Sequence, residues 1–283
     1  MSKNFDVTGK VAVITGGAGV LCAEMARALA KENVQIAILD FNEEAAQKLA
    51  DEIKSGGNKA IAIKANVLEK KSLESARDIV LGEFGKIDVL INGAGGNNPK
   101  ATTTNEQLFA ADLKSNVEGQ KSFFDLESDG VQFVFNLNFL GTLLPTQIFG
   151  KCMAEQNRGV IINISSMNAF RPLTKIPAYS AAKAAISNFT QWSAMHLAPV
   201  GIRVNAIAPG FFLTAQNKFL LTDEKTAELT TRGEKIIAHT PMGRFGEPGD
   251  LTGTLLWLIS DASAFVTGIV VPVDGGFSAF SGV

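Results

Sequence analysis

Short apolar runs recur along the chain, and segments with a helical spacing of apolar residues lie between them. The runs that we interpret as strands are 11–14, 35–39, 61–67, 88–95, 160–166, 203–208 and 268–276. Runs of this length without a polar face are typical of parallel strands that helices cover on both sides. Apolar residues have helical spacing after the first run, over 43–55, about 72–84 and 251–259, from Phe133 to Leu144, and from Tyr179 past Trp192. The alternation predicts a single α/β domain over residues 1–283, built on a doubly wound parallel sheet with right-handed crossovers.

Two stretches break this alternation. Residues 96–130 are polar and rich in turn-forming residues, and residues 211–247 mix short helical patches with turns. Long irregular segments at the edge of a sheet where ligands bind are often functional. We therefore expect a loop excursion at about 96–130 and a substrate lid at about 211–247. For the first stretch, a solvated insertion without a role is the alternative.

Composition limits the classes of function that fit the chain. Its 283 residues are 46% apolar and carry a net charge of −2 with scattered basic residues, which disfavours a nucleic-acid surface. The start lacks the apolar core of a signal peptide, and no apolar run approaches the roughly 18 residues of a membrane span. Cys22 and Cys152 lie in predicted helices, which disfavours a disulfide. We expect a cytoplasmic protein with no nucleic-acid or membrane partner.

A glycine-rich turn joins the first strand to the first helix. Gly16, Gly17 and Gly19 would let the backbone approach a pyrophosphate, and the helix that begins near Val20 and Leu21 would stabilise its negative charge. Strand, glycine turn and helix follow each other in this order in Rossmann-type dinucleotide-binding domains. An ordinary tight turn is the alternative.

Asp40 ends the second strand, 21 residues after Gly19. A carboxylate at this place can accept hydrogen bonds from ribose hydroxyls of NAD, and it would repel the 2′-phosphate of NADP. Phe41 follows, and no arginine stands in the glycine turn. The sequence therefore predicts NAD as the cofactor. The alternative for Asp40 is an N-cap of the helix over 43–55.

Tyr179 and Lys183 are four residues apart in a predicted helix, so their side chains lie on one face. An ammonium beside a phenol stabilises the phenolate, and we expect Lys183 to lower the pKa of Tyr179 toward the working pH. Ser166 ends the preceding strand and could hydrogen-bond the substrate oxygen with which Tyr179 exchanges a proton. Tyr179 is the single tyrosine among 283 residues that include 19 phenylalanines, although a lone Tyr-x-x-x-Lys is usually a surface pair.

These features together resemble the short-chain dehydrogenase/reductase family over nearly the whole sequence. The matching residues are Thr15-Gly16, Asp40, Asn92-Gly93-Ala94-Gly95, Asn138, Ser166, Tyr179, Lys183, Pro209-Gly210 and Asp274-Gly275-Gly276, in that order. The resemblance implies a catalytic tetrad of Asn138, Ser166, Tyr179 and Lys183, in which Asn138 holds a water that connects Lys183 to solvent. It also implies cofactor contacts from Asn66, Val67, Asn92, Ala94, Gly95, Tyr179, Lys183, Pro209, Gly210 and Thr214. The sequence departs from the family's pattern at Val20 and Cys22, where glycines are usual, and at Asn66, where an aspartate is usual.

Within this family, a closer similarity is to the D-mannonate oxidoreductases, also called fructuronate reductases. It is carried by 91–97, 209–214, 273–277 and the final 281–283. This similarity implies NAD-dependent hydride transfer that interconverts D-mannonate and D-fructuronate. A gluconate 5-dehydrogenase or 3-oxoacyl reductase, and a non-enzymatic NAD-binding scaffold, are the alternatives. Family members are commonly tetramers, and the apolar tail over 277–283 leads us to expect a homotetramer.

A sugar acid needs a cation for its carboxylate, and arginine offers bidentate geometry. Arg171 and Lys175 lie between Ser166 and Tyr179, and Lys100 follows the fourth strand. We take these three, with Asn97, as candidate substrate contacts, and a solvated surface position is the alternative for each. His196 and His239 stand far apart and no cluster has the spacing of metal ligands, so no catalytic metal is expected.

Overall fold

The computed structural model describes residues 3–114, 117–214, 221–223, 226 and 228–282. Its strands are β1 (Val11–Thr15), β2 (Gln35–Asp40), β3 (Ala60–Lys64), β4 (Val89–Asn92), β5 (Gly159–Ile164), β6 (Ile202–Pro209) and β7 (Val270–Val273). They form one parallel sheet in the order β3-β2-β1-β4-β5-β6-β7. The order reverses between β1 and β4, where ligands bind in doubly wound sheets. The sheet confirms the predicted Rossmann-type α/β fold.

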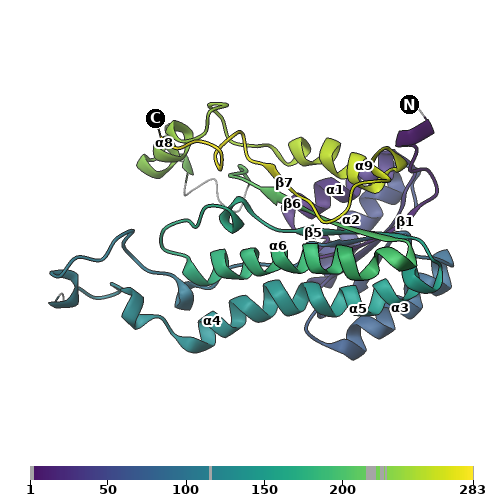
Figure 1. Cartoon of the computed structure of the whole chain (residues 1–283), viewed down its shortest axis with the longest axis horizontal. Helices are drawn as coiled ribbons and strands as arrows, with labels where there is room; N and C mark the ends of the chain where they lie inside the picture. The colour runs from purple at the N-terminus through teal and green to yellow at the C-terminus, as the bar shows by residue number, and fades with distance from the viewer. Residues whose placement is uncertain (1–2, 115–116, 215–220, 224–225, 227, 283) are drawn as a thin grey trace.

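Helices cover both faces of the sheet (Figure 1). They are α1 (Val20–Lys31), α2 (Glu43–Ser55), α3 (Lys70–Phe84), α4 (Ser128–Phe135), α5 (Gly141–Glu155), α6 (Pro177–Leu197), α8 (Thr231–Ala238) and α9 (Thr252–Ile259). Ala12 and Ile14 of β1 pack with α1, α2 and α9, whereas Val11 and Val13 pack with α3 and α5. Successive strand residues point to opposite faces, so the apolar run from Val11 to Ile14 in β1 needs a helical layer on each side. Within the described residues, no helix is both long enough and apolar enough to cross a membrane.

A π-helical turn, Asn136–Leu140, separates α4 from α5. The sequence predicted an uninterrupted helix through Asn138. The side-chain amide of Asn138 donates to the carbonyl of Val134 (2.8 Å) and to that of Gly96 (2.7 Å). A side chain that takes a carbonyl out of the i→i−4 pattern widens a helix locally. The wide turn therefore carries Asn138, fully buried, against the segment that follows β4.

The segment between β4 and α4 forms an extended arm at one end of the molecule (Figure 1). Its described residues contain three short 3-10 helices, Pro99–Ala101, Asp112–Lys114 and Phe123–Asp125. Of the predicted lid over 211–247, residues 215–220, 224–225 and 227 lie outside the described part. The rest includes α8, whose Lys235 forms an ion pair with Glu106 of the arm. The two irregular stretches thus meet beside the sheet's carboxyl edge.

Candidate active site

The glycine turn brings backbone close to the ends of two strands. Gly16 has a φ of +59°, and a Cβ there would lie 2.8 Å from the Cα of Ala94. Only glycine fits such a left-handed, closely approached position. Gly19 is the N-cap of α1 and supplies no side-chain cap, and the first turn of α1 holds no acidic residue. The first amides of a helix have no intrahelical acceptor, so this end of α1 suits a phosphate.

Gly93 makes room for Cys22, which stands where the family's pattern usually has a glycine. A Cβ at Gly93 would overlap the sulfur of Cys22, so the bulk gained at one position is matched by its absence at the other. Cys22 is buried, and burial raises the pKa of its thiol to about 12. The thiol is therefore a packing group at ordinary pH.

The Asp40 carboxylate is held by two backbone amides at the end of β2. One oxygen accepts from the amide of Ala18 in the glycine turn (3.0 Å), and the other accepts from Asn42 (2.9 Å). The N-cap of α2 is Asn42, whose side chain accepts from Ala45. The capping alternative for Asp40 is therefore wrong, and its carboxylate faces a cavity beside the turn.

This cavity has a volume of about 800 Å³ and follows the carboxyl ends of the strands. Of the predicted residues, it is lined by Gly16, Gly19, Val20, Leu21, Asp40, Asn66, Val67, Ala94, Gly95, Ser166, Tyr179, Lys183, Pro209 and Gly210. The volume lies in the upper part of the range for ligand pockets, roughly 300–1,000 Å³. Residues from distant parts of the sequence thus converge where the sheet order reverses.

Four of the predicted cofactor and tetrad residues do not line this cavity. Gly17 donates its amide to Leu39 and packs so tightly that a Cβ would lie 2.9 Å from an atom of Ile38. The side-chain amide of Asn92 is buried and donates to Thr146 and Asn163, so it ties β4 to α5 and β5. Asn138 is buried behind Gly95, and Thr214 is absent from the lining.

Ser166, Tyr179 and Lys183 form one wall of the cavity. The Lys183 Nζ lies 5.5 Å from the centroid of the Tyr179 ring and donates to the carbonyl of Ile164 (2.8 Å). Burial lowers the pKa of Lys183 to about 8. Burial also raises the pKa of Tyr179, and a hydrogen bond with Ser166 opposes this rise. The expected lowering of the tyrosine pKa by Lys183 is therefore wrong for this structure, because loss of water around the phenol outweighs the other effects.

Gly95 separates Asn138 from Lys183. A Cβ at Gly95 would lie 2.7 Å from the Asn138 Oδ1 and 3.2 Å from the Lys183 Nζ. The Asn138 oxygen also accepts from the amide of Gly96 (3.3 Å). The side chain of Asn138 is thus bonded to backbone in both directions, and it fixes the loop that passes beside Lys183.

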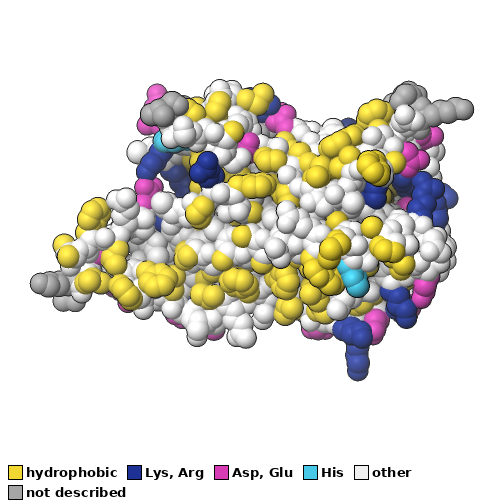
Figure 2. Space-filling model, in the orientation of Figure 1, with side chains coloured by type: hydrophobic (Ala, Val, Ile, Leu, Met, Phe, Trp, Pro, Cys, Tyr) yellow, Lys and Arg dark blue, Asp and Glu magenta, His cyan; other side chains and the backbone are white. Residues whose placement is uncertain are grey.

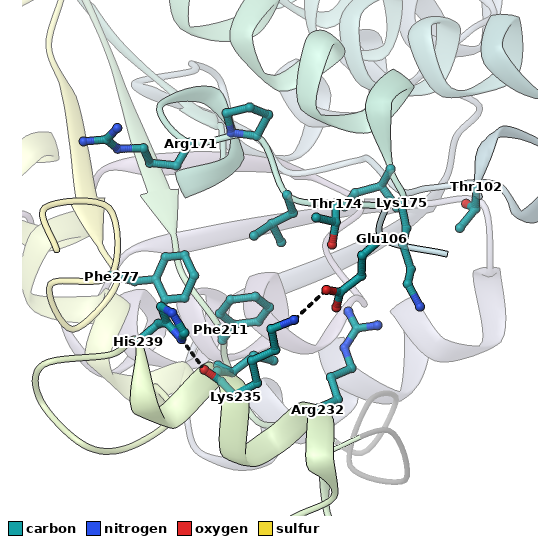
Figure 3. A pocket seen from close by; sticks show the side chains of 14 residues that line it. Thr102, Glu106, Arg171, Thr174, Lys175, Phe211, Arg232, Lys235, His239 and Phe277 are labelled. Carbon is teal, nitrogen blue, oxygen red and sulfur yellow. Dashed lines mark hydrogen bonds and ion pairs between the residues drawn. The ribbon is translucent and has the colours of Figure 1, made fainter. Parts of the chain in front are cut away.

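A second cavity, of about 400 Å³, adjoins the first. Ile176 lines the second cavity, and Tyr179, one helical turn later, lines the first. Likewise, Gly210 lines the first cavity and the adjacent Phe211 lines the second. Its walls include Thr102 and Glu106 of the arm, 171–176, residues of α8 and Phe277 (Figure 3). Arg171 and Lys175, both predicted, lie here, as do Arg232, Lys235 and His239, which sequence reasoning missed.

Lys100 and Asn97 line neither cavity. The ammonium of Lys100 lies 2.8 Å from Asp129 and 3.0 Å from Glu127, and these carboxylates raise its pKa. Asn97 donates to the hydroxyl of Thr102 (3.0 Å). The sequence showed that Lys100 follows a strand but not that it pairs with the start of α4. Neither residue faces the space where a substrate would bind.

Other lining residues of the first cavity were also missed, including Phe41, Leu68, Phe133, Leu137 and Ser165. Most are apolar, and an apolar residue gives the same sequence signal in a cavity wall as in a core. Only Phe41 had a signal in the sequence, its place directly after Asp40, and its side chain is 73% exposed in the structure.

Comparisons with known proteins agree with this geometry. The sequence profile of the family described as short chain dehydrogenase matches residues 10–225. An uncharacterized oxidoreductase of Haemophilus influenzae is 56% identical, over 100% of this chain and 98% of that protein. The uncharacterized oxidoreductase UxuB of Bacillus subtilis is 54% identical, over 98% of each protein. A crystal structure from Haemophilus influenzae, provisionally named a D-mannonate oxidoreductase and solved with bound NAD, superposes with a TM-score of 0.92 at 56% identity, covering 98% of both proteins.

Proposed function

This protein belongs to the short-chain dehydrogenase family, and we propose that it is an NAD-dependent oxidoreductase that interconverts a secondary alcohol and a ketone on a sugar acid. The proposed pair is D-mannonate and D-fructuronate. One observation supports the reaction type most strongly: Ser166, Tyr179 and Lys183 line the same cavity as the glycine turn and Asp40. The residues proposed to transfer the proton and those proposed to bind the dinucleotide thus line the same cavity.

The residues of this cavity fit NAD. Gly16 and Gly19 leave room for backbone to approach a pyrophosphate, and the uncapped start of α1 supplies amides. Asp40 would accept from the ribose hydroxyls, and Asn66 with Val67 would border the adenine. Lys183, Tyr179, Ala94, Gly95, Pro209 and Gly210 would surround the nicotinamide half, and we keep Thr214 and the backbone of Asn92 as outer contacts. When bound, NAD accepts or supplies the hydride.

Tyr179 is the proposed proton-transfer group. In alcohol oxidation its phenolate takes the hydroxyl proton of the substrate, and in ketone reduction its phenol returns a proton to the same oxygen. Ser166 lines the same cavity as the phenol and would orient the substrate oxygen. The Lys183 Nζ lies 5.5 Å from the centroid of the Tyr179 ring, and it would hold the nicotinamide half of NAD beside the phenol. Asn138 acts as a positioning residue, because it orders the loop at Gly95.

The sugar-acid assignment is supported by the cations of the second cavity. A small carboxylate substrate that reaches Tyr179 from that side would lie among positive charges. The name of the similar Haemophilus influenzae structure points to the same substrate class. We further propose a homotetramer located in the cytoplasm, with no catalytic metal.

A substrate panel tests this function. NADH absorbance would be followed with D-mannonate and NAD, and with D-fructuronate and NADH, beside D-gluconate, 5-keto-D-gluconate and an acetoacetyl thioester. We expect kcat/KM for the mannonate–fructuronate pair to exceed that of every other substrate at least about tenfold, or roughly 1.4 kcal/mol. Tyr179→Phe is the control and should lower kcat by at least about 10³-fold. Higher efficiency with gluconate or the thioester would reassign the substrate, and NAD binding without any turnover would favour the scaffold alternative.

A further inference from the structure

We infer that Lys175, Arg232 and Lys235, gathered around Glu106, form the site that binds the substrate carboxylate, with Arg232 as its principal contact. We call these four residues the Glu106 cluster. The inference rests on the proposed function for its choice of a sugar-acid substrate. Of the three cations expected from the sequence, Arg171, Lys175 and Lys100, only Lys175 belongs to this cluster.

Three separate segments build the Glu106 cluster. Glu106 comes from the arm, Lys175 from the loop before α6, and Arg232 and Lys235 from α8. Lys235 forms an ion pair with Glu106. Its hydrogen bond and charge lower the pKa of the Glu106 carboxyl, and the charges of Lys175 and Arg232 lower it further. The guanidinium of Arg232 lies between Glu106 and the ammonium of Lys175 (Figure 3). Three cations thus face a single carboxylate at the wall of the second cavity.

Arg232, like Lys175, is a cation of the cluster whose side chain is left for a ligand. Glu106 and Lys235 satisfy each other, and no hydrogen bond or ion pair joins Arg232 to another residue within the described ranges. Since the cluster holds more positive than negative charge, a second carboxylate would be attracted to it. A guanidinium offers the bidentate geometry that suits a carboxylate.

The backbone of Lys175 gives independent support. Lys175 adopts a φ of +72°, which is costly for a residue with a side chain, about 1–3 kcal/mol. Its carbonyl accepts from the amide of Thr103 in the arm (2.8 Å). Such strain tends to persist where it serves a site. The side chain of Lys175 runs toward Arg232 in Figure 3.

Arg171 lies in the same cavity but away from the cluster. Its guanidinium points to the opposite side in Figure 3, and its Nε donates to the carbonyl of Ser278 (3.2 Å). Arg171 therefore ties the loop after β5 to the C-terminal tail. Its position gives a direct comparison, since two arginines of one cavity should respond differently to the same substitution.

Binding of D-mannonate and of uncharged D-mannitol to the enzyme saturated with NADH tests the inference, because no turnover occurs in this complex. We expect Arg232→Gln to weaken D-mannonate binding, and to raise its KM, at least tenfold, with an unchanged dissociation constant for NADH. Arg232→Lys should recover part of the loss. Arg171→Gln, and Arg158→Gln at an exposed ion pair far from both cavities, should change D-mannonate affinity less than twofold. D-Mannitol should bind equally to all variants.

Glu106→Gln provides a second test that does not remove a cation. Loss of the internal carboxylate frees Lys235, so we expect D-mannonate to bind severalfold more tightly. Unchanged affinity in Arg232→Gln, or an equal loss in Arg171→Gln, would overturn the inference, and so would unchanged affinity in Glu106→Gln if Arg232→Gln does not fold. The same data separate this inference from the proposed function. If D-mannonate binding depends on Arg232 but NAD does not oxidise D-mannonate, the carboxylate site stands and the proposed reaction is rejected. If Arg232→Gln turns over D-mannonate with a normal KM, the reaction stands and the carboxylate site is rejected.

Discussion

At the scale of single residues, burial decides the pKa values of two groups in the site. The phenol of Tyr179 and the ammonium of Lys183 share one wall, yet burial shifts each pKa toward the neutral form. The Lys183 Nζ is also bonded to a carbonyl and not to the phenol oxygen. Both shifts oppose the charged forms of the pair, so a charged group that binds beside it would change both pKa values.

Tyr179 can be titrated directly, because it is the only tyrosine. We expect tyrosinate absorbance in the free protein to show a pKa above the ordinary value of about 10. The oxidised nicotinamide ring is cationic, so NAD should lower this pKa relative to the NADH complex. Equal values in the two complexes would remove the electrostatic basis of the proton-transfer assignment, and Tyr179→Phe should abolish the titration.

Lys183 should cost stability at neutral pH. Its pKa of about 8 in the folded protein lies below the ordinary 10.5, so folding disfavours the ammonium. The unfolded protein binds more protons between these values, and stability from this group rises with pH across that window. We expect Lys183→Met to raise the free energy of unfolding at pH 7 by about 2 kcal/mol, measured by denaturant titration, and to abolish activity. The gain should shrink at pH 10, and a destabilised variant at pH 7 would contradict the assigned burial cost.

Asp40 should set the choice of cofactor. Its carboxylate is fixed by Ala18 and Asn42 at the cavity edge, so it cannot easily turn away from a 2′-phosphate. We expect kcat/KM with NAD to exceed that with NADP at least about tenfold, or roughly 1.4 kcal/mol. Asp40→Ser should narrow this ratio by weakening the repulsion. Equal efficiency with both cofactors in the unaltered enzyme would refute the assignment.

At the scale of elements, patterns that act within one segment could be predicted from the sequence. Apolar runs located the strands, since a strand buried on both faces is mostly apolar. The π turn at Asn138 could not be predicted, because the amide that bonds the carbonyl of Val134 is also held by Gly96, 42 residues away. Arg232 and Glu106 were missed for the same reason. Their meeting depends on how two irregular segments fold against each other, and a charged residue in a loop is usually solvated.

Gly95 tests how closely these elements are fitted. A Cβ at this position would press on Asn138 and Lys183, so Gly95→Ala should lower kcat at least tenfold and reduce the melting temperature. Gly82→Ala in α3 is the matched control, because a Cβ there meets no atom within 4 Å. That change should stabilise the protein by about 0.5–1 kcal/mol and leave kcat unchanged. Similar effects of the two substitutions would show that the fit at Gly95 has no functional weight.

At the scale of the whole molecule, large apolar side chains remain exposed. Hydrophobic side chains gather over α4, α5 and α6 (Figure 2), and the exposed residues there include Phe133, Leu140, Trp192 and Met195. The C-terminal tail is less free than the sequence suggested, since the rings of Phe277 and Phe211 pack 5.2 Å apart. Contiguous apolar surface of this kind usually marks an interface. The helical face is therefore a better candidate for subunit contact than the tail.

We expect a homotetramer in which two-fold axes pair these helical faces. Light scattering on a sizing column at micromolar concentration should give about four times the 30.0 kDa of one subunit. Trp192 is 51% exposed on α6, and Trp192→Glu would place an unpaired charge in the proposed contact, so it should yield dimers or monomers. Ile79→Glu is the matched control, because Ile79 is also 51% exposed but lies on α3. A monomer in the unaltered protein would refute the assembly, and a tetramer that survives Trp192→Glu would move the interface to another face.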